Sequence, residues 1–360
     1  MNHTPDQTSL VPRRRVGIVR DRRFLAHDPG PAHPESPRRL EVLHAVLDEP
    51  GVRPLFTELA PREATLEELF WNHTPDYIEH VRRACLQGPR SLEPDTVVSP
   101  GSWGASLLAA GGVFSALDSL VAGGVDVALA LVRPPGHHAE EDRAMGFCLF
   151  NNVALGAHYA RRRLDCRRVM IVDWDLHHGN GTQRSFYADP TVLFASIHQS
   201  PFYPGTGPLG ETGTGAGERY TVNIPLRAGA DDEVYAAAFN QVILPIGKTY
   251  GPDLILVSAG LDIHWDDPLG SMEVTENGIA YMTRRLLELA ADCCGGRLLI
   301  CLEGGYSPRG LREGLMGVLS ECAGRAEISG DPVNDLRSIR HPAMELIAEF
   351  HGRQWPVINA

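Results

Sequence analysis

The chain has 360 residues, of which 43% are hydrophobic and 22% charged, and its formal net charge is −12. This composition is typical of a globular protein that forms one large α/β domain, and the acidic balance argues against a surface that binds nucleic acid. No apolar run approaches the length of a membrane span, and the first residues lack the pattern of a secretory signal, so we expect a soluble cytoplasmic protein without a membrane partner.

The N-terminal third is expected to be mostly helical. Residues 1–14 are polar and end in arginines, which predicts a mobile tail, and the R-V-G-I-V run that follows predicts the first strand. Helices are expected at about residues 37–47, 66–70 and 76–85, where apolar residues recur at helical spacing. A loop at residues 88–101 carries Glu93 and Asp95, and the nearly uncharged segment 102–122 predicts a helix that is buried on most sides.

The rest of the chain alternates between strands and helices. Strands are expected at residues 125–132, 169–172, 192–197, 220–225, 254–258 and 298–302, with helices that end near residue 163 and that span 234–250, 275–291 and 308–322. This alternation predicts a single three-layer α/β domain whose doubly wound, mostly parallel sheet carries helices on both faces. We expect the domain to span residues 15–325, and residues 326–360 to form an extension that packs on it or trails it.

Residues 169–183 read V-M-I-V-D-W-D-L-H-H-G-N-G-T-Q, so a buried strand runs directly into carboxylates and imidazoles. If the chain stays extended past Val172, the two-residue period of a strand puts Asp173, Asp175 and His177 on one face. Oxygen and nitrogen ligands of this kind suit zinc or another first-row divalent ion. Taken alone, the motif also fits aspartates that cap a helix or that bind magnesium beside a phosphate.

Two other strand ends carry ionisable residues. The strand at 125–132 leads into R-P-P-G-H-H-A-E, where a rigid Pro-Pro-Gly turn presents His137 and His138 side by side. The strand at 254–258 leads into a segment with Asp262, Asp266 and Asp267. The seven cysteines have no paired metal spacing, which indicates reduced core thiols. We therefore expect the site at the carboxyl edge of the sheet, with the long loop 201–217 as one of its walls.

The chain resembles the zinc-dependent histone deacetylase family in five motifs that occur in the same order: R-P-P-G-H-H-A, G-F-C-L-F-N-N-V-A, V-D-W-D-L-H-H-G-N-G-T-Q, S-A-G-L-D with D-D-P-L-G, and L-E-G-G-Y. The resemblance covers roughly residues 15–322 and extends to bacterial deacetylase-like amidohydrolases and acetylpolyamine amidohydrolases. The wording of the motifs is closer to the class II branch. The resemblance to the family implies an arginase/deacetylase-like fold with one catalytic Zn²⁺ per chain.

The resemblance implies two metal sites. Asp175, His177 and Asp267 match the family's three zinc ligands, which leave a fourth position open for catalysis, whereas Asp266 has no match. A structural K⁺ next to the zinc would be held by Asp173, Ser196 and main-chain oxygens around Asp175 and His177.

The resemblance also assigns the acid–base residues. His137 and His138 match the tandem histidines, of which the first bonds to an aspartate, here Asp173, and the second to Asn180. Because a carboxylate partner favours imidazolium and a neutral amide does not, we expect His138 to be the general base and His137 to give electrostatic support. Tyr306 matches the tyrosine whose hydroxyl stabilises the oxyanion.

The walls of the pocket are implied in the same way. Phe147, which follows Gly146, and Tyr203 match the two aromatic positions that line the acyl-lysine tunnel. The second position is commonly Phe, so Tyr203 adds a hydroxyl. Asp95 resembles the loop residue that accepts a hydrogen bond from the substrate backbone, and Arg39 resembles the arginine beneath the site.

We therefore expect a hydrolase that removes acetyl or other acyl groups from lysine in a peptide or protein. An acetylated polyamine or similar small amine is the close alternative, and its mark would be acidic residues that constrict the mouth of the pocket, with candidates Glu93, Asp95, Glu211 and Glu273. A two-manganese ureohydrolase would lack the histidine pair, and a non-catalytic binder of acyl ligands would have lost a ligand or Tyr306. The sequence leaves open the acyl group, the metal used in the cell and whether the chain forms a homo-oligomer.

Overall fold

The computed structural model describes residues 14–325 and 335–359, so the tail predicted for residues 1–14 lies almost wholly outside the described residues. Its centre is an eight-stranded sheet of order β2-β1-β5-β10-β9-β6-β7-β8, in which each neighbouring pair is parallel. The inner strands are buried and almost entirely apolar, as a parallel sheet covered on both faces requires. The strands are β1 (Val16–Val19), β2 (Phe56–Leu59), β5 (Val127–Ala130), β6 (Val169–Asp173), β7 (Val192–Gln199), β8 (Thr221–Leu226), β9 (Leu254–Ala259) and β10 (Leu298–Leu302).

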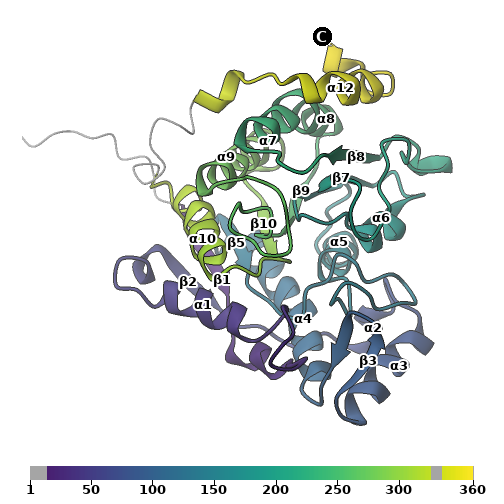
Figure 1. The fold of residues 1–360 in the computed structure, drawn as a ribbon, viewed down its shortest axis with the longest axis vertical. Helices are drawn as coiled ribbons and strands as arrows, with labels where there is room; N and C mark the ends of the chain where they lie inside the picture. The colour runs from purple at the N-terminus through teal and green to yellow at the C-terminus, as the bar shows by residue number, and fades with distance from the viewer. Residues whose placement is uncertain (1–13, 326–334, 360) are drawn as a thin grey trace, which may run out of the picture.

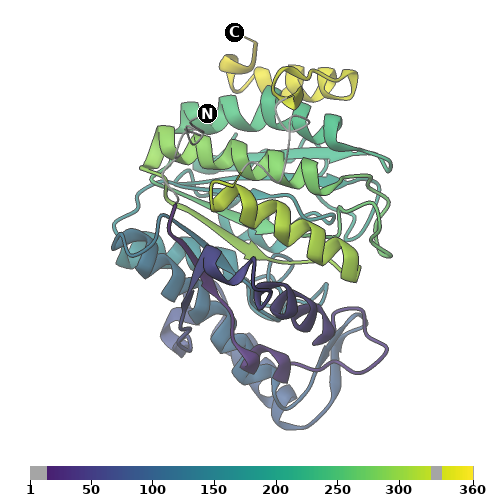
Figure 2. The same ribbon diagram turned by 90° about the vertical axis from the view of Figure 1, so that its left-hand side faces the viewer.

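Helices cover both faces of the sheet (Figures 1 and 2). One face carries α4 (Ser102–Val121), α5 (Asn152–Arg163) and α6 (Asn180–Phe186), with α2 (Leu66–Leu69) and α3 (Pro75–Leu86) outside them. The other face carries α1 (Arg38–Leu47), α7 (Asp232–Ala238), α8 (Leu244–Tyr250), α9 (Glu276–Cys294) and α10 (Pro308–Cys322). The predicted three-layer, doubly wound α/β fold is confirmed.

The order of the strands decides which loops meet. The sheet is parallel, so the carboxyl ends of its strands lie along one edge. The strands β5, β10, β9 and β6 are adjacent in the sheet. β5 leads to the histidine pair, β10 to Tyr306, β9 to Asp262, and β6 to Asp175 and His177. Segments far apart in the chain are thereby brought to one place.

Three elements were not expected from the sequence. The edge strand β2 forms only by pairing with β1. An antiparallel hairpin, β3 (Arg90–Glu93) and β4 (Thr96–Val98), occupies the segment expected to be a loop. The helix expected at 234–250 is interrupted by a π-helical turn at Phe239–Ile243, just before Pro245. Proline has no N–H to donate to the carbonyl one helical turn earlier, so one helix hydrogen bond is missing. The locally wider π-helical turn accommodates this missing bond.

One expectation about apolar runs was wrong. Among the described residues, α4 is long and apolar enough to cross a membrane by length and composition. However, 72% of its most apolar stretch is buried inside the protein, against β1, β5 and α5. Its low polarity is therefore that of a core helix, as the near absence of charge had indicated.

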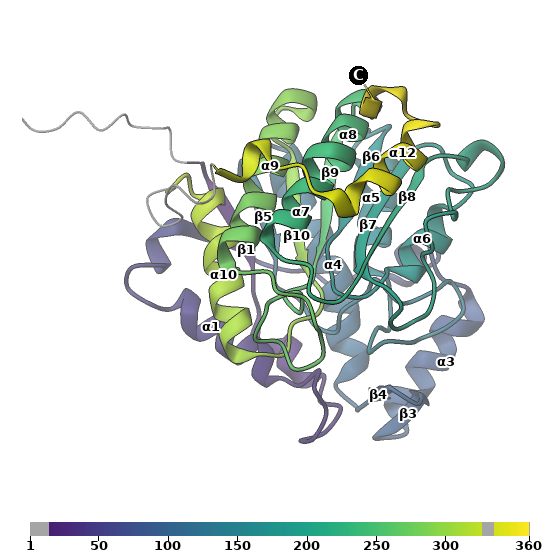
Figure 3. The same cartoon turned by 45° about the horizontal axis from the view of Figure 1, so that its top comes forward.

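The described C-terminal residues 335–359 pack against the domain, over α7 and α8 and at the exposed side of β8 (Figure 3). Their helix α12 (Glu345–Gly352) places the buried His351 so that its Nε2 lies 2.9 Å from the main-chain oxygen of Asn223 in β8. Trp355 is 4% exposed and donates from Nε1 to the Arg219 oxygen at 3.1 Å. This segment thus covers the edge strand, which would otherwise offer unpaired backbone groups.

Candidate active site

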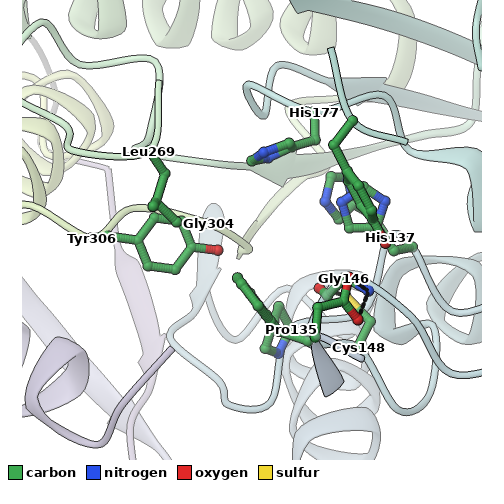
Figure 4. Close-up of a pocket in the computed structure, with 12 residues that line it drawn as sticks. Pro135, His137, Gly146, Cys148, His177, Leu269, Gly304 and Tyr306 are labelled. Atoms are coloured by element: carbon green, nitrogen blue, oxygen red, sulfur yellow. Dashed lines mark hydrogen bonds between the residues drawn. The ribbon is translucent and has the colours of Figure 1, made fainter. Parts of the chain in front are cut away.

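A pocket of about 220 Å³ opens at the carboxyl edge of the sheet, where the loops after β5, β6, β9 and β10 meet. Figure 4 shows Tyr306 and Leu269 on one side and His137 and His177 on the other, with the Tyr306 hydroxyl directed into the space between them. The lining residues are Asp95, Pro135, His137, His138, Gly146, Phe147, Cys148, His177, Tyr203, Leu269, Gly304 and Tyr306. All seven cysteines are free, and Cys148 is the one in this lining.

Asp175, His177 and Asp262 converge at the base of the pocket, each with one ligand atom within 4.8 Å of the others. His177 Nδ1 lies 3.1 Å from Asp175 Oδ1 and 3.4 Å from Asp262 Oδ2. Ligands held at about 2.1 Å around a tetrahedral ion are about 3.4 Å apart, so these separations suit zinc. Asp262 Oδ2 is buried and accepts no hydrogen bond within the described chain, as an oxygen reserved for a cation would.

The electrostatics of this cluster also favour a cation. Burial by itself would lower the pKa of His177, but the adjacent carboxylates of Asp175 and Asp262 outweigh it and raise the pKa to about 9. Two carboxylates in a buried space thus hold a positive charge between them. Gly304 lets the backbone approach them, since a Cβ there would lie 2.0 Å from Asp262 Oδ2.

Asp267, which was predicted to be the third zinc ligand, lies outside this cluster, and Asp262 takes the third position in it. Asp267 Oδ2 accepts the backbone N–H groups of Tyr306 at 2.6 Å and Ser307 at 3.1 Å, and Oδ1 accepts that of Leu269 at 3.0 Å. Its carboxylate is therefore occupied in holding the segment around Tyr306. Asp262 stands closer to the end of β9, and its Oδ1 accepts the Leu176 N–H at 3.0 Å.

The two histidines have the two different partners named above. His137 Nδ1 lies 3.0 Å from Asp173 Oδ2, and His138 Nδ1 lies 2.8 Å from Asn180 Oδ1. Asn180 Nδ2 donates to Glu140 Oε1 at 2.9 Å, which turns its oxygen toward His138. His138 Nδ1 therefore carries the proton, and its Nε2 keeps a free lone pair.

The protonation of the pair follows from these contacts. Burial alone would lower the pKa of His137, but the carboxylates of Asp175 and Asp173 raise it well above the usual value. Burial and the positive charges of His137 and His177 hold the pKa of His138 well below its usual value. At neutral pH one ring is an imidazolium and the other is a neutral base.

Tyr306 and Arg39 lie together opposite the histidines. The Arg39 guanidinium carbon is 4.9 Å from the centre of the Tyr306 ring. Arg39 Nε donates to the Gly305 oxygen at 2.6 Å, and Nη1 pairs with Glu35 at 3.0 Å. The arginine thus supports the glycine-rich turn that carries the tyrosine.

Phe147 and Tyr203, the two aromatic residues predicted to wall a tunnel, both line the pocket. Phe147 has φ +68°, a strained conformation for a residue with a side chain, and its ring meets Tyr306 edge-on at 5.9 Å. Gly146 before it contacts His138 so closely that a Cβ would lie 2.2 Å from the ring. Asp95 accepts the Gly146 N–H at 3.2 Å, and burial together with the nearby Asp95 carboxylate raises the pKa of Tyr203.

Two further sets of residues lie behind the pocket. Asp173 is paired with Ser196 across β6 and β7, at the position suggested for potassium, and Ser196 Oγ lies 3.0 Å from His198 Nδ1. The sequence gives Glu303 no role beyond its place in the motif L-E-G-G-Y, yet its buried carboxylate contacts the histidine turn. A charged residue at a strand end was the only sequence signal for it.

Fold and pocket together define a hydrolase of the arginase/deacetylase-like α/β class. A model of the histone deacetylase domain matches residues 33–322. A probable deacetylase of Archaeoglobus fulgidus is 40% identical over 330 residues, which cover 91% of this chain and 89% of that protein. Histone deacetylase 5 of Arabidopsis thaliana is 36% identical over 89% of this chain, but the match spans only 50% of the plant protein.

Among solved structures, the HDA15 HD domain is similar with a TM-score of 0.87, 36% identity and 96% coverage of both chains. The chain belongs to the histone deacetylase family, whose deacetylases hydrolyse amide bonds.

Proposed function

We propose that the protein is a zinc-dependent deacetylase that acts on acetylated lysine side chains. The observation that carries the proposal is the convergence, on one pocket, of the carboxylate–histidine cluster with a neutral histidine and a tyrosine hydroxyl. Amide hydrolysis needs an electrophile for the carbonyl, a base for water and a donor for the oxyanion, and these groups supply all three.

Asp175, His177 and Asp262 would hold the zinc, which when bound would polarise the carbonyl and lower the pKa of water. His138 Nε2 would accept the proton of the attacking water and pass it to the leaving amine. His137, held as imidazolium by Asp173, would favour the developing negative charge without giving up its proton. The Tyr306 hydroxyl would donate a hydrogen bond to the carbonyl oxygen.

The mouth of the pocket favours a peptide substrate over a polyamine. Among the described lining residues, Asp95 is the only acidic one, and Leu269 adds an apolar side chain. Glu93 pairs with Arg143 at 3.1 Å, and Glu211 Oε2 accepts the Gln183 amide at 2.6 Å, so both carboxylates are engaged elsewhere. An acetylated polyamine keeps at least one free ammonium group, which would need an acidic partner at the mouth.

A hydrolysis assay by mass spectrometry tests the proposal. Zinc-loaded wild type and Tyr306→Phe are compared on an acetyl-lysine peptide, N-acetylputrescine and N8-acetylspermidine. We expect the peptide to be cleaved fastest and the Phe variant to lose about a hundredfold in kcat. Faster cleavage of the acetylamines would overturn the substrate assignment, and binding of zinc without cleavage of any compound would overturn the activity.

Two smaller proposals accompany this one. A structural K⁺ beside Asp173 and Ser196 would stabilise the segment that carries the zinc ligands, so the melting temperature of the zinc-loaded protein should be higher in KCl than in NaCl at equal ionic strength. A cytoplasmic location is proposed as well, and fractionation of the source cells would test it.

A further inference from the structure

The side chain of Glu303 bridges loops from two different strands. Glu303 is the first residue after β10, and it is fully buried. Its Oε2 accepts the backbone N–H groups of Gly136 at 2.7 Å and His137 at 3.2 Å, and its Oε1 accepts the Ser258 hydroxyl at 3.0 Å. One carboxylate therefore holds the histidine turn after β5 and a residue of β9.

The main chain of the same residue belongs to a second part of the site. The Glu303 oxygen accepts a hydrogen bond from Arg39, and the N–H of Gly304 donates to Asp175 Oδ2 at 2.9 Å. Tyr306 follows three residues after Glu303. Glu303 thus connects the turn that carries the general base to the turn that carries the oxyanion donor.

The sheet order explains why this position can do so. Strand β10 lies between β5 and β9, so a side chain at its carboxyl end faces the ends of both neighbours. The two backbone N–H groups that it binds are buried with their turn, and they would lack these acceptors if the carboxylate were removed.

We propose that Glu303 is a positioning residue for the deacetylase reaction, which fixes the histidine pair relative to Tyr306 and to the metal ligands. The inference rests on the proposed function. Glu303 lines no part of the pocket and acts through His137. Misplacement of reacting groups by about 1 Å can cost about a hundredfold in rate, so loss of the tether should lower kcat and leave substrate binding largely unchanged.

Zinc-loaded Glu303→Ala and Glu303→Gln test the proposal, with Glu68→Ala as the control. Glu68 is also a buried glutamate that accepts a backbone N–H, but its partners are Thr65 and Arg62, away from the pocket. We expect Glu303→Ala to lose at least about tenfold in kcat with KM within about threefold and zinc content unchanged. Glu303→Gln should recover most of the rate, because an amide oxygen accepts the same N–H groups and the serine hydroxyl can accept from the amide.

Several outcomes would overturn the inference: an alanine variant with kcat within twofold of wild type, a glutamine variant as slow as the alanine variant, or an equal loss in Glu68→Ala. Imidazole ¹⁵N NMR of the zinc-loaded variants gives a second readout. Should the wild type hydrolyse no acyl amide, the proposed activity fails, yet unchanged His137 signals in Glu303→Ala would still refute the tether and shifted signals would support it.

Discussion

Asp262 and Asp267 follow the same strand, but Asp262 belongs to the candidate metal cluster and Asp267 accepts backbone hydrogen bonds around Tyr306. Substituting each by asparagine separates these two roles. Structural sites with four ligands bind Zn²⁺ with a free energy of about 10–16 kcal/mol, or roughly 3 kcal/mol for each ligand. Asp262 Oδ2 has no hydrogen-bond partner in the described chain and faces His177. Asp262→Asn should therefore weaken zinc binding by about a hundredfold.

Asp267→Asn should leave zinc affinity within about threefold of wild type, because the carboxylate lies outside the cluster. Its oxygens accept three backbone N–H groups, and an asparagine oxygen can keep those of Tyr306 and Ser307. The N–H of Leu269 would then face the amide nitrogen and lose its acceptor, at a cost of about 1–3 kcal/mol. The free energy of unfolding, rather than the metal content, should change.

The assay is a competition titration with a zinc chelator, followed by urea unfolding of each zinc-free variant. Equal chelator and protein concentrations allow the two dissociation constants to be compared directly. The assignment is refuted if Asp267→Asn loses zinc while Asp262→Asn retains it, because the third ligand would then be the residue that the structure places outside the cluster.

Three further predictions concern stability. Glu35 is fully buried and pairs with Arg133 at 2.5 Å. Glu35→Gln should therefore lower the free energy of unfolding in urea by about 3–5 kcal/mol, whereas Glu79→Gln at the surface should lower it by less than about 1 kcal/mol. Similar losses in the two variants would contradict this. Burial lowers the pKa of His73 to about 3, so the unfolded chain binds the proton first as pH falls below 6.5. Between pH 7 and pH 5 the free energy of unfolding of the wild type should thus fall by roughly 2 kcal/mol more than that of His73→Gln. An equal pH dependence in the two proteins would argue against a neutral buried ring. Trp355→Ala should lower the free energy of unfolding by about 3–5 kcal/mol, and the exposed Val357→Ala should lower it far less. An equally small loss in both variants would show that the C-terminal segment does not stabilise the domain.

The sequence predicted the main strands and helices because their signals are local. Apolar runs bounded by turn residues mark β5, β6, β9 and β10, and each ends in ionisable residues that had to lie at one edge of a parallel sheet. The short strand β2 and the hairpin β3–β4 carry no such signal. They form through pairing with neighbours, and that pairing depends on tertiary contacts.

The site was predicted in part for the same reason. Strand period alone placed Asp175 and His177 together, and motif order pointed to the histidine pair and Tyr306. The motif pointed to Asp267, but the cluster contains Asp262. Both residues follow one strand closely, and the turn of the chain between them decides which one reaches His177.

By itself, the sequence determined the class of fold, the edge of the sheet that carries the site and most of the residue types found there, since these follow from hydrophobic period and from motifs read along the chain. Only the tertiary structure decided which aspartate completes the cluster and that Glu303 holds the histidine turn. The reach of a side chain depends on which strands are neighbours in the sheet, and β10 lies between β5 and β9 although the chain forms it last of the three.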